Sequence, residues 1–199
     1  TTLNFGYNKN KLIDIDDSDI NVFGITSGNA SVKGYPLGAI FSFRYAGLDG
    51  TDGTPQYYID GGNSVAKNVS SLNDIVYSGT RIPKYNGSLT NIFTYKNFNL
   101  SLMFVYYGGH VLRGEAAPFL SLPPTTNVNR DILNRWQQPG DEKRANVTPA
   151  FTGYSLDATT VRHPWYAADV HVIKGDYIKL RDLSFTYTFD RQLTDKWGV

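Results

Sequence analysis

The chain has 199 residues with 19 basic and 18 acidic side chains, so its formal charge of +1 offers no field that would attract nucleic acid or an anionic membrane surface. It has no cysteine, which excludes disulfides, thiolate metal sites and a cysteine nucleophile. Aromatic residues make up 14% of the chain and accompany 19 glycines and 9 prolines, a composition that favours an all-β protein.

The first predicted elements are strands. Residues 1–8 alternate Leu3, Phe5 and Tyr7 with polar or small neighbours, and residues 38–48 alternate in the same way. A weaker strand is predicted at Ile20–Ile25. No initiator methionine or signal peptide precedes the first strand, so we expect the chain to be part of a longer protein.

The clearest element is a hairpin in residues 85–107. Odd positions are apolar up to Lys96-Asn97, and even positions are apolar after it. A two-residue turn at Lys96-Asn97 would place both apolar sets on one face of one sheet. The expected pairs are Tyr95 with Phe98, Phe93 with Leu100, Asn91 with Leu102, and Leu89 with Phe104.

The rest of the chain is predicted to hold one long loop and one long strand. Residues 108–169 are rich in Pro, Asn, Thr and Gly and are much longer than an ordinary connection. Within them, residues 129–136 predict a short helix, since Ile132 and Trp136 are four apart and Pro139-Gly140 would end it. Residues 177–189 alternate again and predict a long strand.

Long strands, a tight turn and a long loop favour an antiparallel transmembrane β-barrel segment with long extracellular loops. The two hairpin arms have the roughly nine to eleven residues that a tilted transmembrane strand needs. Aromatic residues occupy both ends of the apolar face and mainly aliphatic residues its middle, as at a lipid-facing surface. The residues predicted to face lipid are Tyr85, Leu89, Phe93, Tyr95, Phe98, Leu100, Leu102, Phe104 and Tyr106.

Four stretches resemble the SusC/RagA class of TonB-dependent outer-membrane transporters. They are YPLGAIFSFRYAGLDGTDGTPQYY (residues 35–58), RIPKYNGSLTNIFTYKNFNLSLMFVYYGG (81–109), RWQQPGDE (135–142) and GDYIKLRDLSFTYTF (175–189). The second and fourth are long and stand in the order usual for the family. The resemblance therefore covers much of the chain and places all of residues 1–199 in the C-terminal barrel portion of such a protein.

The resemblance implies a plugged barrel of about twenty-two strands in the outer membrane of a Gram-negative bacterium. It implies import of oligosaccharides or peptides together with a SusD-like surface lipoprotein, driven by the TonB complex through an N-terminal part that we expect to lie outside these residues. The plug and signal peptide are likewise expected to lie outside the chain. The expected partners are this lipoprotein, TonB, outer-membrane lipid and the solute, with no nucleic acid.

Two groups of residues are candidates for contact with solute or lid. Trp136, Trp165 and Tyr166 lie in the long loop, where their rings could stack on sugar rings or simply pack the loop onto itself. Polar residues predicted to line the lumen are Arg44, Asn91, Asn99 and Ser101. Polar lumen residues are also what contact with water requires.

No catalytic residue, cofactor or metal site is predicted. The acidic stretches at residues 14–19 and 49–53 suggest calcium, but neither has EF-hand spacing, and solvated turns account for them better. His110, His163 and His171 form no ligand pair, and no nucleophile elbow or nucleotide loop is present.

Two other classes remain as alternatives. A soluble β-sandwich that binds carbohydrate would seal Leu100, Leu102 and Phe104 beneath a second layer and use Trp and Tyr as its platform. A glycoside hydrolase would need a convergent carboxylate pair in a cleft, and the acidic residues here cluster in turns.

Overall fold

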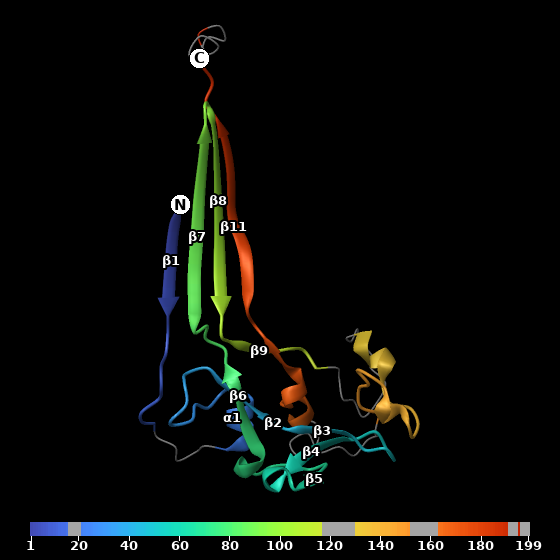
Figure 1. Cartoon of the computed structure of the whole chain (residues 1–199). Helices are drawn as coiled ribbons and strands as arrows, with labels where there is room; N and C mark the ends of the chain where they lie inside the picture. The colour runs from blue at the N-terminus through green and yellow to red at the C-terminus, as the bar shows by residue number, and fades with distance from the viewer. Residues whose placement is uncertain (16–20, 117–129, 152–162, 191–194, 196–199) are drawn as a thin grey trace. The chain divides into compact units, whose positions relative to one another are not determined.

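The computed structural model describes residues 1–15, 21–116, 130–151, 163–190 and 195 (Figure 1). The chain divides into two compact units. The first, here called the sheet unit, comprises Thr1–Lys9, Ile82–His110 and Lys174–Val199. The second, the loop unit, comprises Asn10–Arg81 and Val111–Ile173.

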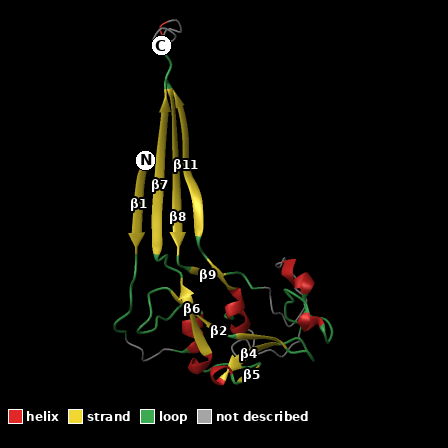
Figure 2. Ribbon diagram, viewed as in Figure 1, coloured by secondary structure: helices red, strands yellow, loops and turns green. Residues whose placement is uncertain are grey.

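The sheet unit is built on one four-stranded antiparallel sheet, in the order β1-β7-β8-β11 (Figure 2). Its strands are β1 (Thr2–Tyr7), β7 (Tyr85–Tyr95), β8 (Phe98–Gly108) and β11 (Tyr177–Tyr187). The strands predicted in residues 1–8, 85–107 and 177–189 are thereby confirmed. Strands adjacent in the sheet are also successive along the sheet unit, so the topology is a simple up-and-down meander.

The hairpin forms with the predicted register. Tyr95 pairs with Phe98 across the Lys96-Asn97 turn, and Lys96 has a φ of 50°. The other three expected pairs, Phe93 with Leu100, Asn91 with Leu102 and Leu89 with Phe104, are present as well. Both long connections leave the sheet from the end opposite this turn, because β1, β7, β8 and β11 alternate in direction.

A β-bulge interrupts β11. Leu180 pairs with Phe104 and Leu183 with Leu102, and the register shifts between Leu180 and Asp182. The bulge moves the apolar phase from even to odd residues, so that Ile178, Leu180 and Leu183 share a face despite their spacing. A prediction from strict alternation places Ile178 and Leu180 on the opposite face from Leu183 and does not reveal the bulge.

The loop unit contains short elements. They are α1 (Val22–Thr26), β2 (Ala39–Phe43), β3 (Tyr45–Leu48), β4 (Pro55–Ile59), η1 (Asp60–Gly62), β5 (Ser64–Ala66), η2 (Leu72–Asp74), β6 (Ile75–Thr80), β9 (Val111–Arg113), η3 (Arg130–Asn134), η4 (Asp141–Lys143), α2 (His163–Tyr166) and η6 (Asp169–His171). β2 pairs with β6, β4 lies between β3 and β5, and β9 pairs with β10 (Val172–Lys174).

Two hydrophobic clusters hold this unit together. The larger comprises Phe43, Tyr57, Val69, Ala167 and Ala168, and the smaller comprises Leu48, Trp136 and Ala150. Both draw residues from each of the two chain segments, so the described parts of residues 10–81 and 111–173 share their cores. The second segment holds most of the predicted long loop at 108–169, while the first was not predicted to be a connection.

Three local predictions need correction. The described part of the predicted strand at Ile20–Ile25 is helix α1, because the Asn21 side chain accepts a hydrogen bond from Gly24 N at 2.8 Å and caps it. The strand predicted at residues 38–48 is interrupted at Arg44. It forms β2, which pairs with β6, and β3, which pairs with β4. The helix predicted at 129–136 is the 3₁₀ helix η3, with Asn129 outside the described residues.

In the described residues, no helix is long and apolar enough to cross a membrane. The two hydrophobic clusters both lie in the loop unit. Leu100 and Leu102 are half-buried and Phe104 is exposed. Among the described residues of the sheet unit, there is therefore no second layer of the kind that a soluble β-sandwich requires.

Candidate functional site

The candidate site of the sheet unit is its apolar face. Strand registers place one set of apolar side chains from all four strands on this face. The set consists of Leu3, Phe5, Tyr7, Tyr85, Leu89, Phe93, Tyr95, Phe98, Leu100, Leu102, Phe104, Tyr106, Ile178, Leu180, Leu183, Phe185 and Tyr187. All nine residues predicted to face lipid belong to it, while the contribution of β1 and of the first half of β11 was not predicted.

Aromatic side chains gather at both ends of the apolar face. Next to the turn, the rings of Phe98 and Tyr187 are 4.7 Å apart, with Tyr95 in the same row. At the other end, the rings of Tyr7 and Tyr85 are 5.5 Å apart. Leucines and phenylalanines make up most of the rows between, which also contain Asn91, Gly87, Tyr106 and Ile178. This is the pattern of a hydrocarbon band between two interfacial girdles.

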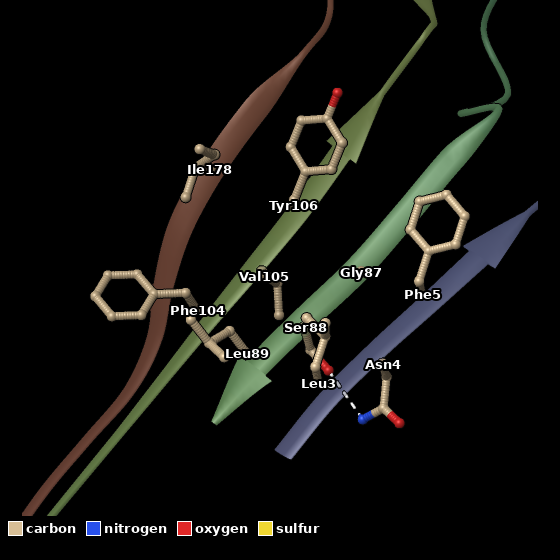
Figure 3. Close-up of a pocket in the computed structure, with 10 residues that line it drawn as sticks. All are labelled: Leu3, Asn4, Phe5, Gly87, Ser88, Leu89, Phe104, Val105, Tyr106 and Ile178. Carbon is tan, nitrogen blue, oxygen red and sulfur yellow. Dashed lines mark hydrogen bonds between the residues drawn. The ribbon is translucent and has the colours of Figure 1, made fainter. Parts of the chain in front are cut away.

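A shallow hollow interrupts the face at Gly87 (Figure 3). In one row across the strands, Phe5, Gly87, Tyr106 and Ile178 follow one another, and the glycine leaves a gap between two rings. The hollow has a volume of about 440 Å³. A Cβ at Gly87 would lie 3.0 Å from the Asn4 carbonyl oxygen, so the gap also relieves close backbone approach.

The opposite face of the sheet is more polar. Asn99 Nδ2 lies 3.3 Å from Thr94 Oγ1, and Asn4 Nδ2 donates to Ser88 Oγ at 3.2 Å (Figure 3). Ser101 lies on this same face. The polar placement of Asn99 and Ser101 agrees with a surface that meets water, and their role in lining a lumen remains a prediction.

The other two predicted lumen residues lie elsewhere. Asn91 pairs with Leu102 and shares the apolar face, where Thr1 Oγ1 donates to its side-chain oxygen, so its assignment to the polar face was wrong. The predicted pairing of Asn91 with Leu102 already indicated that the two residues share a face. Arg44 lies in the loop unit, at the break between β2 and β3, with its guanidinium 5.0 Å from the centre of the Tyr58 ring.

The tryptophans predicted to contact solute or lid are core residues. Trp136 is 8% exposed, and its Nε1 donates to Glu142 Oε2 at 3.3 Å. Trp165 is 3% exposed and packs edge-on against His171, with ring centres 4.4 Å apart. Burial leaves neither ring a free face for a sugar, so loop packing is their role here. Tyr166 is half-buried, and its carbonyl accepts a hydrogen bond from Arg113.

No protein-family model matches the chain. Two curated relatives from Formosa agariphila align over all of it: TonB-dependent receptor P3 at 23% identity, covering 20% of that protein, and TonB-dependent receptor P39 at 21%, covering 23%. The RagAB peptide importer in its closed-closed state superposes on 96% of this chain and 21% of its own, with a TM-score of 0.65 and 18% identity. A second structure, of the RagAB peptide transporter, covers 81% and 17% with a TM-score of 0.58.

The resemblance to TonB-dependent transporters of the SusC/RagA type is confirmed. The chain spans about a fifth of the length of the curated relatives that it matches. The fold of the sheet unit is that of an antiparallel segment from such a β-barrel. The predicted location, the outer membrane of a Gram-negative bacterium, is confirmed with it.

The acidic turn at residues 49–53 is neutralised by a lysine of the same unit. Lys67 Nζ lies 2.9 Å from Asp49 Oδ2 and 2.7 Å from Asp52 Oδ2. Hydrogen bonds from Thr51 and then Lys67 lower the pKa of Asp49. No group of three metal-ligating side chains occurs in the described residues, although most of the acidic stretch at 14–19 lies outside them.

The histidines occupy three separate surroundings. His110 Nδ1 lies 3.8 Å from Asp176 Oδ1 in the sheet unit. His163 Nε2 lies 2.7 Å from Thr26 Oγ1, and burial lowers the pKa of His163. Burial and the charge of Arg113 lower the pKa of His171 to about 4. Each histidine thus contacts different local neighbours.

Sequence reasoning missed Arg113, which joins the two segments of the loop unit. Its Nη1 donates to the Tyr166 and Ala168 carbonyls at 3.2 and 3.3 Å. Its Nη2 donates to the Phe41 carbonyl at 2.8 Å and Ser42 Oγ at 3.2 Å. These partners come from distant parts of the chain, and no local sequence motif predicts them.

Proposed function

We propose that this chain forms part of the barrel of a TonB-dependent transporter that imports oligosaccharides or peptides through the outer membrane. One observation carries the proposal: the four-stranded antiparallel sheet presents an uncovered apolar face between two aromatic rows. Its single two-residue turn and two long connections emerge at opposite ends of the sheet, as in outer-membrane barrels.

A SusD-like surface lipoprotein is the proposed partner, together with TonB acting through parts of the protein outside this chain. The RagAB structures with which the chain superposes are those of a peptide importer, which supports a peptide as one class of solute. The surface of the folded loop unit is the proposed place of contact with solute or lid. No step in this proposal requires covalent chemistry by these residues.

The membrane assignment is tested by spin labels on single cysteines in the full-length protein, reconstituted in bilayers. The pair Leu100→Cys and Ser101→Cys is matched, because neighbouring residues of β8 lie on opposite faces. We expect the label at 100 to be accessible to oxygen dissolved in lipid and the label at 101 to a water-soluble relaxant. Equal access of the water-soluble relaxant to both labels would contradict a lipid-facing sheet.

Import is tested separately by uptake of fluorescent peptides and oligosaccharides into cells that express the full-length protein. We expect uptake of one of these solutes to disappear when the TonB complex is inactivated. Uptake that persists without TonB would contradict energised transport while leaving the membrane assignment intact.

A further inference from the structure

A small cavity in the loop unit brings two arginines together. It has a volume of about 110 Å³ and is lined by Arg81, by Arg113 and by residues 25–28, which form the end of α1 and the turn after it, over an apolar floor from β2. Thr26 and Ser27, which carry hydroxyl groups, are among its lining residues. The lining residues come from four separate stretches of the chain, and all belong to the loop unit.

The Arg113 guanidinium carries a charge that its neighbours do not neutralise. Its guanidinium nitrogens donate to three backbone carbonyls and one serine hydroxyl. Among the described residues, no carboxylate lies within ion-pair distance of it. A half-buried cation held only by dipoles is costly, and an anion beside it would recover part of that cost.

Arg81 adds a second positive charge to the same cavity. An added Cβ at Gly28, whose φ is 78°, would lie 3.1 Å from Arg81 Nη2, so the glycine leaves room for the guanidinium to lie close to this turn. Arg81 also has no carboxylate within ion-pair distance in the described part of the chain. Arg81 and Arg113 line the same small cavity, and burial and then the charge of Arg81 lower the pKa of Arg113.

We propose that Arg81 and Arg113 form a binding site for one small oxyanion, the carboxylate or sulfate group of a solute. Guanidinium groups match such anions in geometry and charge, and the Ser27 hydroxyl offers a further donor, whereas the Thr26 hydroxyl already donates to the Val22 carbonyl at 2.7 Å. The cavity volume suits a single anionic group and excludes a helix or strand of a partner protein. The site belongs to the loop unit and does not depend on transport.

Titration of the full-length protein in detergent with sodium sulfate and with sodium acetate tests the site. Sodium chloride at equal ionic strength is the reference, and the readout is the thermal unfolding temperature together with calorimetric binding. We expect saturable binding of at least one oxyanion, and Arg81→Gln to weaken it about tenfold or more. Arg81→Lys, which keeps the charge and loses the fork, should weaken it less.

Arg44→Gln is the matched control, because it removes the same charge from the same unit at a site over Tyr58. It should bind the anion as the unchanged protein does. Arg113 is left in place, since its four hydrogen bonds join the two segments and its loss would unfold them. Unchanged affinity in Arg81→Gln would overturn the proposal. So would the absence of binding by both anions.

Discussion

The sheet unit and the loop unit treat the same kinds of side chain in opposite ways. Phe43 of the loop unit is 1% exposed within a shared core, whereas Phe93 of the sheet is 56% exposed on an uncovered face. Both lie in strands with alternating sequences, so alternation alone does not identify the environment. Strand length separates them better, because β7 has 11 residues and β2 has 5. Only the longer strand reaches across a hydrocarbon layer.

The largest expected contrast comes from one substitution made in both units. Phe43→Ala removes a ring from the core and should lower the free energy of unfolding of the loop unit by about 3–5 kcal/mol. Phe93→Ala exchanges one lipid-exposed apolar group for a smaller one and should cost less than about 1 kcal/mol. Denaturant unfolding of the full-length protein in bilayers measures both. Similar losses at the two sites would show that the sheet face is packed against protein.

Charge placed on the two faces of β8 tests the sheet itself. Leu102→Arg puts a guanidinium in the apolar band and should destabilise the bilayer-inserted protein by about 2–4 kcal/mol. Ser101→Arg adds the same group on the polar face and should have a much smaller effect. Refolding into lipid vesicles at a series of denaturant concentrations provides the measurement. A greater loss at 101 than at 102 would reverse the assignment of the faces.

The sheet was predictable because its information is local. Two phases of alternation around Lys96-Asn97 specify the turn, the register and the face of both hairpin arms. The bulge at Arg181-Asp182 was not predictable from period-two alternation, since it changes the phase within one strand. Asn91 shows a different failure, because residue polarity was given more weight than the pairing that placed it beside Leu102.

The loop unit was much less predictable, because its core is assembled from contacts distant in sequence. The Phe43 amide donates to the Ala167 carbonyl at 3.2 Å, and Trp136 packs with Leu48. The local sequence of neither segment indicates which residues of the other it packs against. The tryptophans were therefore predicted to be free for a ligand, although they are buried. The two arginines of the small cavity were missed for the same reason.

Acid should weaken the loop unit through His171. Burial and then Arg113 lower its pKa to about 4, while the Trp165 backbone and Asp169 offset part of this effect. Because the unfolded side chain titrates near 6.5, only the unfolded state takes up the proton between pH 6.5 and 4. Stability should therefore be full above pH 6.5 and fall by about 1–2 kcal/mol towards pH 4, after allowance for solvent screening.

His171→Phe keeps a ring against Trp165 and removes the proton site. Thermal unfolding at pH 7 and pH 4 should show a smaller loss in this variant than in the unchanged protein. An identical loss in both would assign the acid sensitivity to other groups.

The smallest expected effect concerns the acidic turn and separates a neutralised turn from a calcium site. Lys67→Gln breaks the contacts to Asp49 and Asp52 and should cost less than about 1 kcal/mol, with a smaller loss at high salt because the pair is partly exposed. Lys33→Gln is the control, since its contact with Asp14 is far more exposed and should be weaker still. Calcium should leave the unfolding temperature of the unchanged protein where it is, because the Lys67 ammonium already occupies the position between the two carboxylates. A rise with calcium that a chelator reverses would mean that the cation displaces the lysine, and that this loop binds metal after all.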